Sequence, residues 1–516
     1  MSAGSNPRDP AMLTRGIGPA DTPAMRHPLA ILALAAALAP ASAAPRCNVL
    51  FLMADDLNNS LSCYGHAIVR TPNLDRLASR GVRFDSAYCQ YPLCGPSRNS
   101  LLTGLYPNSN GILTNSQIFR QTIPSHISLP QSFRLAGYFA ARVGKLYHYN
   151  VPRSIGTNGH DDPGSWEMEL NPAGCDRLEE EPDIFTLVKG QFGGTLSWYA
   201  SPRPDERHTD GLMAADAEWV LERCARQKDR PFFLAVGFFR PHTPYVAPRP
   251  YFDRYPKGEM PIVRGAAEDQ KDVPAAALAS RQKVQDEMTD DLRQQAVQAY
   301  FASITFMDAQ VGKILAALER LGLAENTIIV FASDHGYHLG EHGLWQKLSL
   351  FEGSTRVPLF IVAPGVSKAG GVAKAPVGLI DLYPTLAELC GVKAPENIQG
   401  QSLVPMLRDP AAEGRGWAFS QITLAAKNKT ARIGYSIRTP RWRYTEWGDE
   451  AADGRELYDH DADPQEITNL AEKSENATTV KALSEKLRST RKATLPPSGT
   501  VPQIGTNLWA PNLTDP

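Results

Sequence analysis

The sequence has 516 residues, of which 42% are hydrophobic and 21% are charged. This composition supplies a large apolar core with a smaller second unit, and it excludes a disordered or fibrous protein. The formal net charge is -2 at pH 7 and no long basic run occurs, so we expect no nucleic-acid partner bound through bulk charge.

Residues 1–44 differ from the rest of the chain and predict an N-terminal extension followed by a secretory signal peptide. Met25-Arg26-His27 precedes an apolar run over 29–39, and the small-residue stretch ASAA follows from Ala41. This alignment suggests that translation starts at Met25. The apolar run is too short to span a bilayer, and a buried Ala-rich helix is the alternative. We expect export to a periplasmic or extracellular location, with no membrane insertion once the signal is removed.

The sequence contains seven cysteines, and the predicted export bears on their redox state. They are Cys47, Cys63, Cys89, Cys94, Cys175, Cys224 and Cys390. An oxidising compartment favours disulfide bonds, but the number is odd and several of these thiols lie in apolar patterns that suit burial. Cys175 with Cys224 is the first pair to test for a bridge.

Five apolar segments predict buried strands, and amphipathic segments that predict helices separate them. The strands are NVLFLMA from Asn48, YFAARVG from Tyr138, FFLAVGF from Phe232, TIIVFAS from Thr327 and PLFIVAP from Pro358. This alternation predicts an α/β fold with a large, mostly parallel, doubly wound sheet flanked by helices. We assign it to a catalytic domain over 45–405.

The pattern changes after about Pro405. Short alternating strands follow, RIGYSIRT from Arg432 and WRYTEW from Trp442, and then a charged helix from Lys481. These features predict a smaller C-terminal subdomain over 406–490, built from an antiparallel sheet and a helix. The Pro- and Gly-rich stretch 491–516 predicts an irregular tail.

The stretch YPLCGPSRNSLLTG reads as a loop that leads into a helix. Cys94 lies just before the predicted helix and Pro96 suits its first turn. Unpaired backbone N–H groups and the helix dipole favour negative charge at such a position. The position therefore suits a thiolate or an incoming anion.

Two predicted strands end in acidic residues. Asp55 and Asp56 follow the first strand, and Asp334 and His335 follow the strand from Thr327. Ligands of α/β sheets bind beyond the carboxyl ends of the strands, and neighbouring carboxylates repel unless a cation separates them. The pattern favours a divalent metal with oxygen ligands over the alternative that each pair caps a helix or turn.

Four basic side chains lie on loops after other strands. They are Lys145 and His148 in GKLYHYN, His242 in RPHTPY and Lys347 in GLWQKLS. A single Lys or His on a loop is usually solvated. Four of them beside a metal site predict a cationic pocket for an oxyanion.

These motifs resemble those of the sulfatase family, the formylglycine-dependent type I enzymes of the alkaline phosphatase superfamily. PLCGPSRNSLLTG is similar to the first family signature, C-x-P-S-R, and GYFAARVGKLYH to the second, with Ala140 where Ser or Thr is usual. Together with MADD, SDHGYHLGEHG and ELYDHDADPQEITNLA, the resemblance runs from about Cys47 to Leu470. Within the family the chain most resembles iduronate 2-sulfatases, as GKLYH, RPHTPY and GYSIRTPRWRYTEW indicate.

The resemblance implies an alkaline-phosphatase-like fold and the hydrolysis of a sulfate ester. The expected substrate is a 2-O-sulfate on a uronic acid of a sulfated polysaccharide or oligosaccharide, as in glycosaminoglycan degradation. A maturation enzyme would oxidise Cys94 to formylglycine, whose hydrate attacks sulfur and forms a sulfo-enzyme intermediate. Residue 94 would bind one Ca²⁺ with Asp55, Asp56, Asp334 and His335. Histidine is an unusual ligand for a hard cation, so Mg²⁺ or Mn²⁺ remains an alternative.

The resemblance also implies roles for the basic residues. Arg98 and Lys145 would stabilise the hydrate, and His148 would take the proton that releases sulfate. His242 and Lys347 would hold the sulfate, and one of them would protonate the leaving oxygen.

Three other functions remain open. The first is a phosphonate or phosphate monoester hydrolase on the same architecture, and the second is a non-catalytic secreted glycan-binding relative. The third is a thiol enzyme that uses Cys94 with His148 or His242 as base. The substrate pocket is expected from loops over 150–205 and 245–295. Four aromatic residues there or nearby could stack on sugars or be buried: Trp166, Trp198, Tyr245 and Trp345.

Overall fold

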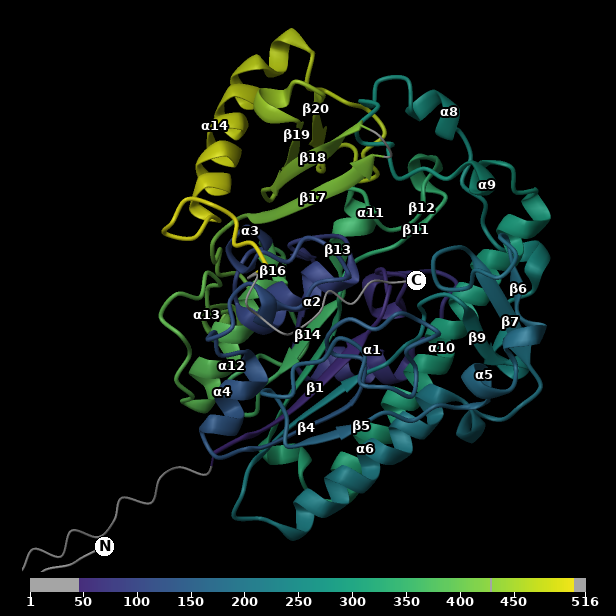
Figure 1. Cartoon of the computed structure of the whole chain (residues 1–516), viewed down its shortest axis with the longest axis vertical. Coiled ribbons are helices and arrows are strands. Elements are labelled where there is room, and N and C mark those ends of the chain that lie inside the picture. Colours follow the sequence, from purple (N-terminus) through teal and green to yellow (C-terminus); the bar gives the residue numbers. More distant parts are fainter. Residues whose placement is uncertain (1–45, 427–428, 505–516) are drawn as a thin grey trace, which may run out of the picture. The chain divides into compact units, whose positions relative to one another are not determined.

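The computed structural model describes residues 46–426 and 429–504 (Figure 1). The expected extension and signal peptide, 1–44, and the last part of the expected tail, 505–516, lie outside the described residues.

An eight-stranded sheet forms the centre of the catalytic part (Figure 1). In sheet order its strands are β15 (Gly371–Ala373), β2 (Val82–Phe84), β14 (Leu359–Val362), β10 (Thr327–Ser333), β1 (Asn48–Ala54), β8 (Phe232–Gly237), β4 (Phe139–Gly144) and β5 (Met168–Leu170). The run from β10 to β5 is parallel throughout, and β15 is parallel to β2. The prediction of a mostly parallel sheet is confirmed.

One predicted strand runs against the others. β14 pairs antiparallel with both β10 and β2. The chain between β10 and β14 contains only short elements: β11 (His338–Leu339), β12 (Trp345–Gln346), α11 (Glu352–Thr355) and β13 (Arg356–Val357). A parallel return needs a long crossover connection, and because none is present the strand comes back in the opposite direction.

Helices cover both faces of the sheet. Consecutive side chains of β1 point to opposite faces, and because they are apolar on both faces, each face must be buried. On one face, Leu50 and Leu52 pack with α1 (Pro72–Arg80), α6 (Thr209–Arg226) and α10 (Asp290–Arg320). On the other, Val49 and Phe51 pack with α2 (Cys94–Thr103), α4 (Leu129–Leu135), α12 (Leu382–Cys390) and α13 (Val404–Arg408). The sheet is therefore doubly wound, as the sequence predicted.

The helix α10 is the one described helix whose length and apolar composition would suffice to cross a membrane. From the sequence we expected no membrane insertion after removal of the signal. In the structure, 83% of the most apolar window of α10 is buried within the protein. The apolar character of α10 is thus explained by its position in the core.

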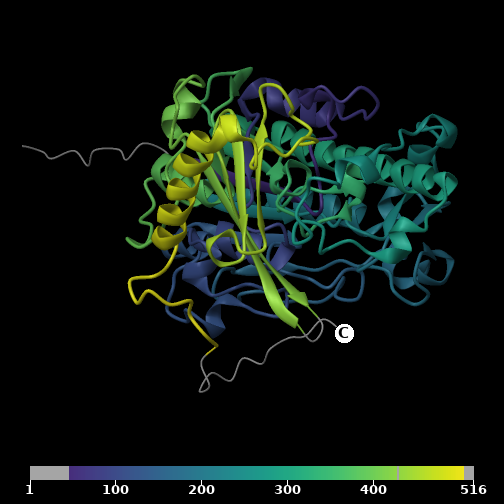
Figure 2. The same cartoon turned by 90° about the horizontal axis from the view of Figure 1, so that it is seen from above.

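A separate four-stranded antiparallel sheet lies in the C-terminal region, in the order β17 (Ala418–Ala426), β18 (Lys429–Arg438), β19 (Trp442–Trp447) and β20 (Gly454–Asp459). The helix α14 (Ala477–Ala493) lies against one face of this sheet (Figures 1 and 2), where Leu483 and Leu487 pack with Ile437. On the other side, Trp447 packs in a cluster with Phe351. The α14 helix continues three residues into the range expected to be an irregular tail.

The remaining elements are short. Two small sheets consist of β3 (Ala87–Tyr88), β13 and β16 (Val377–Gly378), and of β6 (Phe185–Thr186), β7 (Ser197–Ser201) and β9 (Tyr245–Pro248). The short helices are α3 (Pro107–Asn110), α5 (Cys175–Leu178), α7 (Arg249–Phe252), α8 (Ala266–Asp269) and α9 (Lys283–Asp286).

The disulfide considered between Cys175 and Cys224 does not form, since all seven cysteines of the described residues are free thiols. Cys175 lies beside the first turn of α6, where the Gly174 N–H donates to Thr209 Oγ1 at 3.0 Å. Cys224 lies in the last turns of the same helix. About four turns of helix, roughly 22 Å, separate these two positions, far beyond the reach of a disulfide.

Candidate active site

Two neighbouring parallel strands carry the acidic residues to one edge of the sheet. The register of β1 and β10 ends with Ala54 opposite Ser333, so Asp55 and Asp334 follow side by side. Asp56 has a left-handed backbone, with φ of 64°, and its N–H donates to Asp334 Oδ1 at 3.1 Å. All three carboxylates are fully buried. The predicted convergence of these acids is therefore present.

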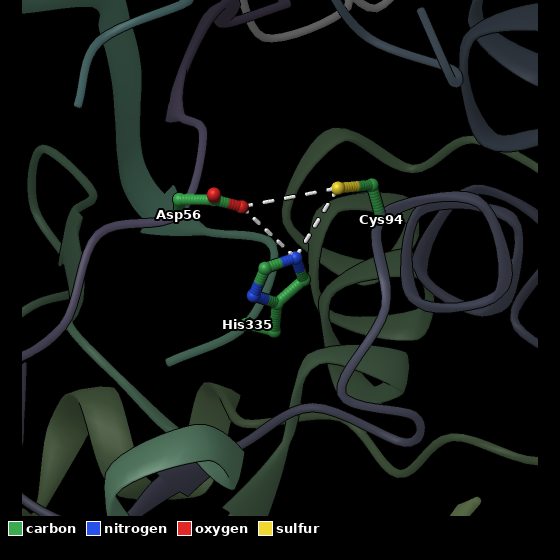
Figure 3. A group of neighbouring side chains, drawn as sticks. All are labelled: Asp56, Cys94 and His335. Atoms are coloured by element: carbon green, nitrogen blue, oxygen red, sulfur yellow. Dashed lines mark hydrogen bonds and ion pairs between the residues drawn. The ribbon is translucent and has the colours of Figure 1, made fainter. Parts of the chain in front are cut away.

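Cys94 is the first residue of α2, one position further into the helix than the sequence suggested. Its Sγ lies 3.3 Å from His335 Nε2 and 3.9 Å from Asp56 Oδ1 (Figure 3), and it lies 3.4 Å from Lys347 Nζ. The thiol is fully buried. The helix N-terminus thus meets the acidic residues from the ends of β1 and β10.

Arg98, one turn further along α2, holds two of the carboxylates. Its Nη2 donates to Asp55 Oδ1 at 3.0 Å and its Nε to Asp334 Oδ2 at 2.9 Å. Lys145, which follows β4, donates from Nζ to Asp55 Oδ2 at 2.6 Å. The planar guanidinium can bridge two carboxylates in a fixed geometry, which a lysine cannot do. Both basic residues face Asp55, and they fix its orientation.

Lys347 and His242 approach Asp56 from loops on other elements. Lys347 Nζ donates to Asp56 Oδ1 at 2.6 Å, and His242 Nε2 lies 3.8 Å from Asp56 Oδ2. His242 Nδ1 is 2.5 Å from the Thr243 carbonyl, which assigns the proton to Nδ1 and leaves Nε2 toward the cluster. Two of the basic residues predicted to form a pocket, Lys347 and His242, therefore lie beside Cys94 and Asp56.

The structure describes His148 as buried in the loop after β4, with its ring 5.4 Å from that of His160 in an edge-on arrangement. The role expected for His148 stays a prediction. The four aromatic residues considered for sugar stacking are all buried, which is the alternative that the sequence left open: Trp166, Trp198, Tyr245 and Trp345.

Burial and charge shift the acidities in this cluster in opposite directions. Burial opposes ionisation of Asp55, yet the positive charges of Lys145 and its basic neighbours hold the pKa of that carboxyl well below its usual value. Burial raises the pKa of Asp56, with the charges of Asp55 and Asp334 adding to it. Burial likewise raises the pKa of the Cys94 thiol well above its usual value, although nearby lysines oppose this. An unmodified thiol here is thus a poor nucleophile.

The cluster fits a divalent cation. Asp56, Cys94 and His335 lie with their ligand atoms within 4.8 Å of one another, and so do Asp55, Cys94 and Asp334. Asp56 Oδ2 is buried and has no hydrogen-bond partner in the described part of the chain. His335 Nδ1 donates to the Gly336 carbonyl at 2.9 Å, so its Nε2 lone pair points into the group. The three carboxylates suit a hard cation such as Ca²⁺.

Three supporting residues were not identified from the sequence. Ser97 donates from Oγ to the Asp334 carbonyl at 2.5 Å, and Asn115 Oδ1 accepts from the Gly95 N–H at 2.8 Å. Tyr300 of α10 donates to the Asp56 carbonyl at 2.8 Å. Ser97 lies inside the C-x-P-S-R motif and could have been assigned, whereas Asn115 and Tyr300 lie in no motif.

Two family models match the chain. The model described as Sulfatase matches residues 47–392, and the model described as N-sulphoglucosamine sulphohydrolase, C-terminal, matches residues 340–493. The first covers more than half of the chain and contains Cys94 and the carboxylates around it.

Curated relatives are similar in sequence to this chain over most of their own length. A sulfatase of Formosa agariphila is 35% identical over 461 residues, which cover 86% of each chain. An iduronate 2-sulfatase of Mus musculus is 31% identical over 529 residues, which cover 86% of this chain and 94% of that protein. The resemblance to sulfatases stated from the motifs is confirmed.

Solved structures share the fold. The phosphonate monoester hydrolase of Agrobacterium radiobacter superposes with a TM-score of 0.72 at 25% identity, covering 89% of this chain and 100% of that one. A protein solved in complex with its substrate D-glucosamine-2-N,6-O-disulfate superposes with a TM-score of 0.69 at 25% identity, covering 87% and 98%. The predicted architecture, with its C-terminal sheet and helix, is confirmed.

Proposed function

The chain belongs to the sulfatase family and is a sulfuric ester hydrolase, and from this premise we propose that it removes a sulfate group from a sugar, with residue 94 as the nucleophile. The observation that carries the proposal is the position of Cys94 between three buried carboxylates and Lys347. A maturation enzyme would convert the thiol to formylglycine before the enzyme acts. When hydrated, that aldehyde supplies one hydroxyl to attack sulfur and a second whose loss of a proton expels sulfate.

A cation at Asp55, Asp56, Asp334 and His335 would lower the pKa of a bound oxygen, and Ca²⁺ suits this donor set. The basic residues of the chain would orient the carboxylates that hold this cation. Arg98 and Lys145 orient Asp55, and Arg98 also orients Asp334. Because Arg98 contacts Asp55 and Asp334, we assign it a positioning role and no direct contact with the nucleophile.

Lys347 and His242, which lie beside Asp56, would bind the sulfate. Burial, with the charge of Lys347, lowers the pKa of His242 well below its usual value, so this imidazole would take up a proton on Nε2 only when a negatively charged sulfate group binds beside it. Lys347 keeps its proton, because its carboxylate neighbours raise its pKa despite burial. Lys347 is therefore the better candidate for protonating the leaving oxygen.

Lys347→Ala and His242→Ala are each expected to reduce kcat on a sugar sulfate by ~10²–10³ while changing KM much less. The reason is that both side chains would gain interaction energy as charge moves onto the bridging oxygen in the transition state. Steady-state kinetics with a sugar sulfate and with an activated aryl sulfate checks this. The variant that lacks the proton donor should recover most of its rate on the aryl sulfate, because phenolate leaves without help.

The variant that lacks only a sulfate contact should stay impaired on both substrates. On the pKa argument above, we expect Lys347→Ala to be the variant that recovers. Near wild-type turnover of the sugar sulfate by both variants would rule out the roles assigned to these two residues.

The specific substrate that we propose is a 2-O-sulfate on a uronic acid of a polysaccharide or oligosaccharide. The similarity to an iduronate 2-sulfatase supports this class, and the similarity to a protein solved with a sulfated glucosamine supports a carbohydrate more generally. Sulfate release from a panel of defined saccharides, each with one sulfate position, tests it. Release from 2-O-sulfated uronic acids alone is expected, and release only from amino-sugar sulfates would contradict it.

A second activity has one observation in its favour, the structural likeness to a phosphonate monoester hydrolase. Phosphate and sulfate esters share their shape and an in-line displacement. Rates on matched aryl sulfate, aryl phosphate and aryl phosphonate esters distinguish the two activities. We expect the sulfate ester to be hydrolysed fastest.

We also propose that the chain is exported and cleaved near Ala44. The apolar run over 29–39 and the small residues after it support this. N-terminal sequencing of the mature protein, after expression of the full chain in a cell with an export system, tests it. A mature N-terminus close to Pro45 is expected, and retention of the apolar run would contradict it.

A further inference from the structure

A second group of metal-ligating side chains lies apart from the catalytic cluster, where α5 meets the start of α6. Cys175 is the first residue of α5, Glu180 follows this helix, and His208 directly precedes α6. The Sγ, one carboxylate oxygen and one ring nitrogen of these residues lie within 4.8 Å of one another. The three residues are 2%, 4% and 1% exposed, respectively.

Three polar atoms in this group are buried without a hydrogen bond of ordinary geometry in the described residues. Glu180 Oε2 and both ring nitrogens of His208 are buried and form no hydrogen bond of ordinary geometry within residues 46–426 and 429–504. The other oxygen of Glu180 accepts from Ser201 Oγ at 2.6 Å, which fixes the carboxylate. Buried polar atoms are normally satisfied, so an unpaired carboxylate oxygen and an unpaired imidazole nitrogen beside a thiol point to a missing ligand.

We propose that Cys175, Glu180 and His208 bind one zinc ion, with water as the fourth ligand. A tetrahedral zinc site with bond lengths of about 2.0–2.3 Å places its ligand atoms roughly 3.5 Å apart, so the group, whose ligand atoms lie within 4.8 Å of one another, would contract around the ion. Sulfur and imidazole ligands favour zinc over Ca²⁺ or Mg²⁺, which take oxygen. The proposal is independent of the function proposed above.

The charges of the group balance on binding. A thiolate and a carboxylate together neutralise Zn²⁺, and the imidazole is neutral, because burial lowers the pKa of His208 more than the nearby Asp176 and Glu180 raise it. Burial raises the pKa of the Cys175 thiol to about 12, with Glu180 and Asp176 adding to this effect. The free thiol is therefore protonated, and the zinc displaces that proton into solvent, one per ion bound.

The site would fix the loop that carries His242. Asp176, next to Cys175, accepts from Arg240 Nη2 at 2.6 Å and from the Thr209 N–H at 2.8 Å. Arg240 lies two residues before His242, and its own N–H is held by Asp210 of α6 at 3.0 Å. A zinc ion that ties α5 to α6 would thus stabilise the backbone that positions His242, without itself touching substrate.

Cobalt titration of the purified full chain tests the site, because Co²⁺ takes the place of zinc and a Co²⁺–thiolate bond has a distinct charge-transfer absorption. The titration is done in a Cys94→Ala background, where Cys94 cannot supply the thiolate. We expect one equivalent of Co²⁺ to give the thiolate band, and zinc to displace it. The matched control, Cys94→Ala with Cys224→Ser, removes a buried thiol from the last turns of α6 and should keep the band.

The double variant Cys94→Ala, Cys175→Ser should lose the band. Because Cys175→Ser could also unfold the protein, His208→Ala is measured beside it and should lower zinc affinity at least tenfold while the circular dichroism spectrum stays unchanged. Zinc added after chelation should raise Tm in the Cys94→Ala protein and in the Cys224 control, but not in the His208 variant. Absence of a thiolate band in the parent, or its persistence in the Cys175→Ser variant, would overturn the proposal.

Discussion

Replacing Cys94 with alanine is expected to reduce kcat on every sulfate ester by about 10⁶ or more, the scale of loss when an enzyme loses its nucleophile. The cluster of described residues offers no second group that could take its place, because Asp55 and Asp334 are paired with Arg98 and Lys145, and Asp56 is paired with Lys347. Circular dichroism and Tm should show a folded protein, because alanine keeps the first residue of α2 helical.

The matched control is Cys89→Ala. Cys89 is equally buried, lies five residues earlier and directs its thiol toward the Ser354 carbonyl at 3.9 Å. This variant should lose some stability through a small cavity and keep kcat within a few-fold of wild type. Equal losses of kcat in both variants would show that the effect of Cys94→Ala comes from the fold.

Removing the divalent cation is expected to stop turnover and lower Tm together. Three buried carboxylates converge here, and Asp56 Oδ2 has no hydrogen-bond partner in the described part of the chain, so the group can accept further positive charge. A bound cation would supply it and stabilise the folded state by mass action. Dialysis against a chelator, followed by activity and thermal-denaturation measurements with and without added Ca²⁺, checks this.

Asp334→Asn should abolish the rise of Tm that Ca²⁺ produces, because it removes one ligand charge. Asp308→Asn is the control for loss of a buried carboxylate elsewhere, since Asp308 only accepts from the backbone of Leu74 and from Asn73. That variant should be less stable but keep the response to Ca²⁺. Activity that survives complete metal removal would contradict the cation site.

The sequence was sufficient to predict the part of the site that the sheet builds. β1 and β10 were recognisable as continuous apolar runs; Asp55 and Asp56 follow the first, and Asp334 and His335 follow the second. Parallel pairing of neighbouring strands then makes those pairs meet at one edge. The Cys94 loop was predictable for the same kind of reason, since Pro96 marks the start of the helix that presents the thiol.

Features that depend on tertiary packing were not predictable. β14 has the same apolar pattern as its parallel neighbours, and only the absence of a crossover helix reverses it. The 2.6 Å contact between Lys347 and Asp56 depends on where the loop after β12 returns to the sheet. Cys175 was considered only as a disulfide partner, because Glu180 and His208 lie at no spacing typical of a metal motif and are brought together by α5 packing on α6.

The most direct test of the central claim is the mass of the peptide that contains residue 94, measured on active enzyme produced with a formylglycine-generating system. We predict a mass loss that corresponds to replacement of the thiol by an aldehyde, capture of this peptide by a hydrazide probe, and specific activity proportional to the converted fraction across preparations. Full activity in a preparation whose residue 94 is entirely unmodified cysteine would contradict the account.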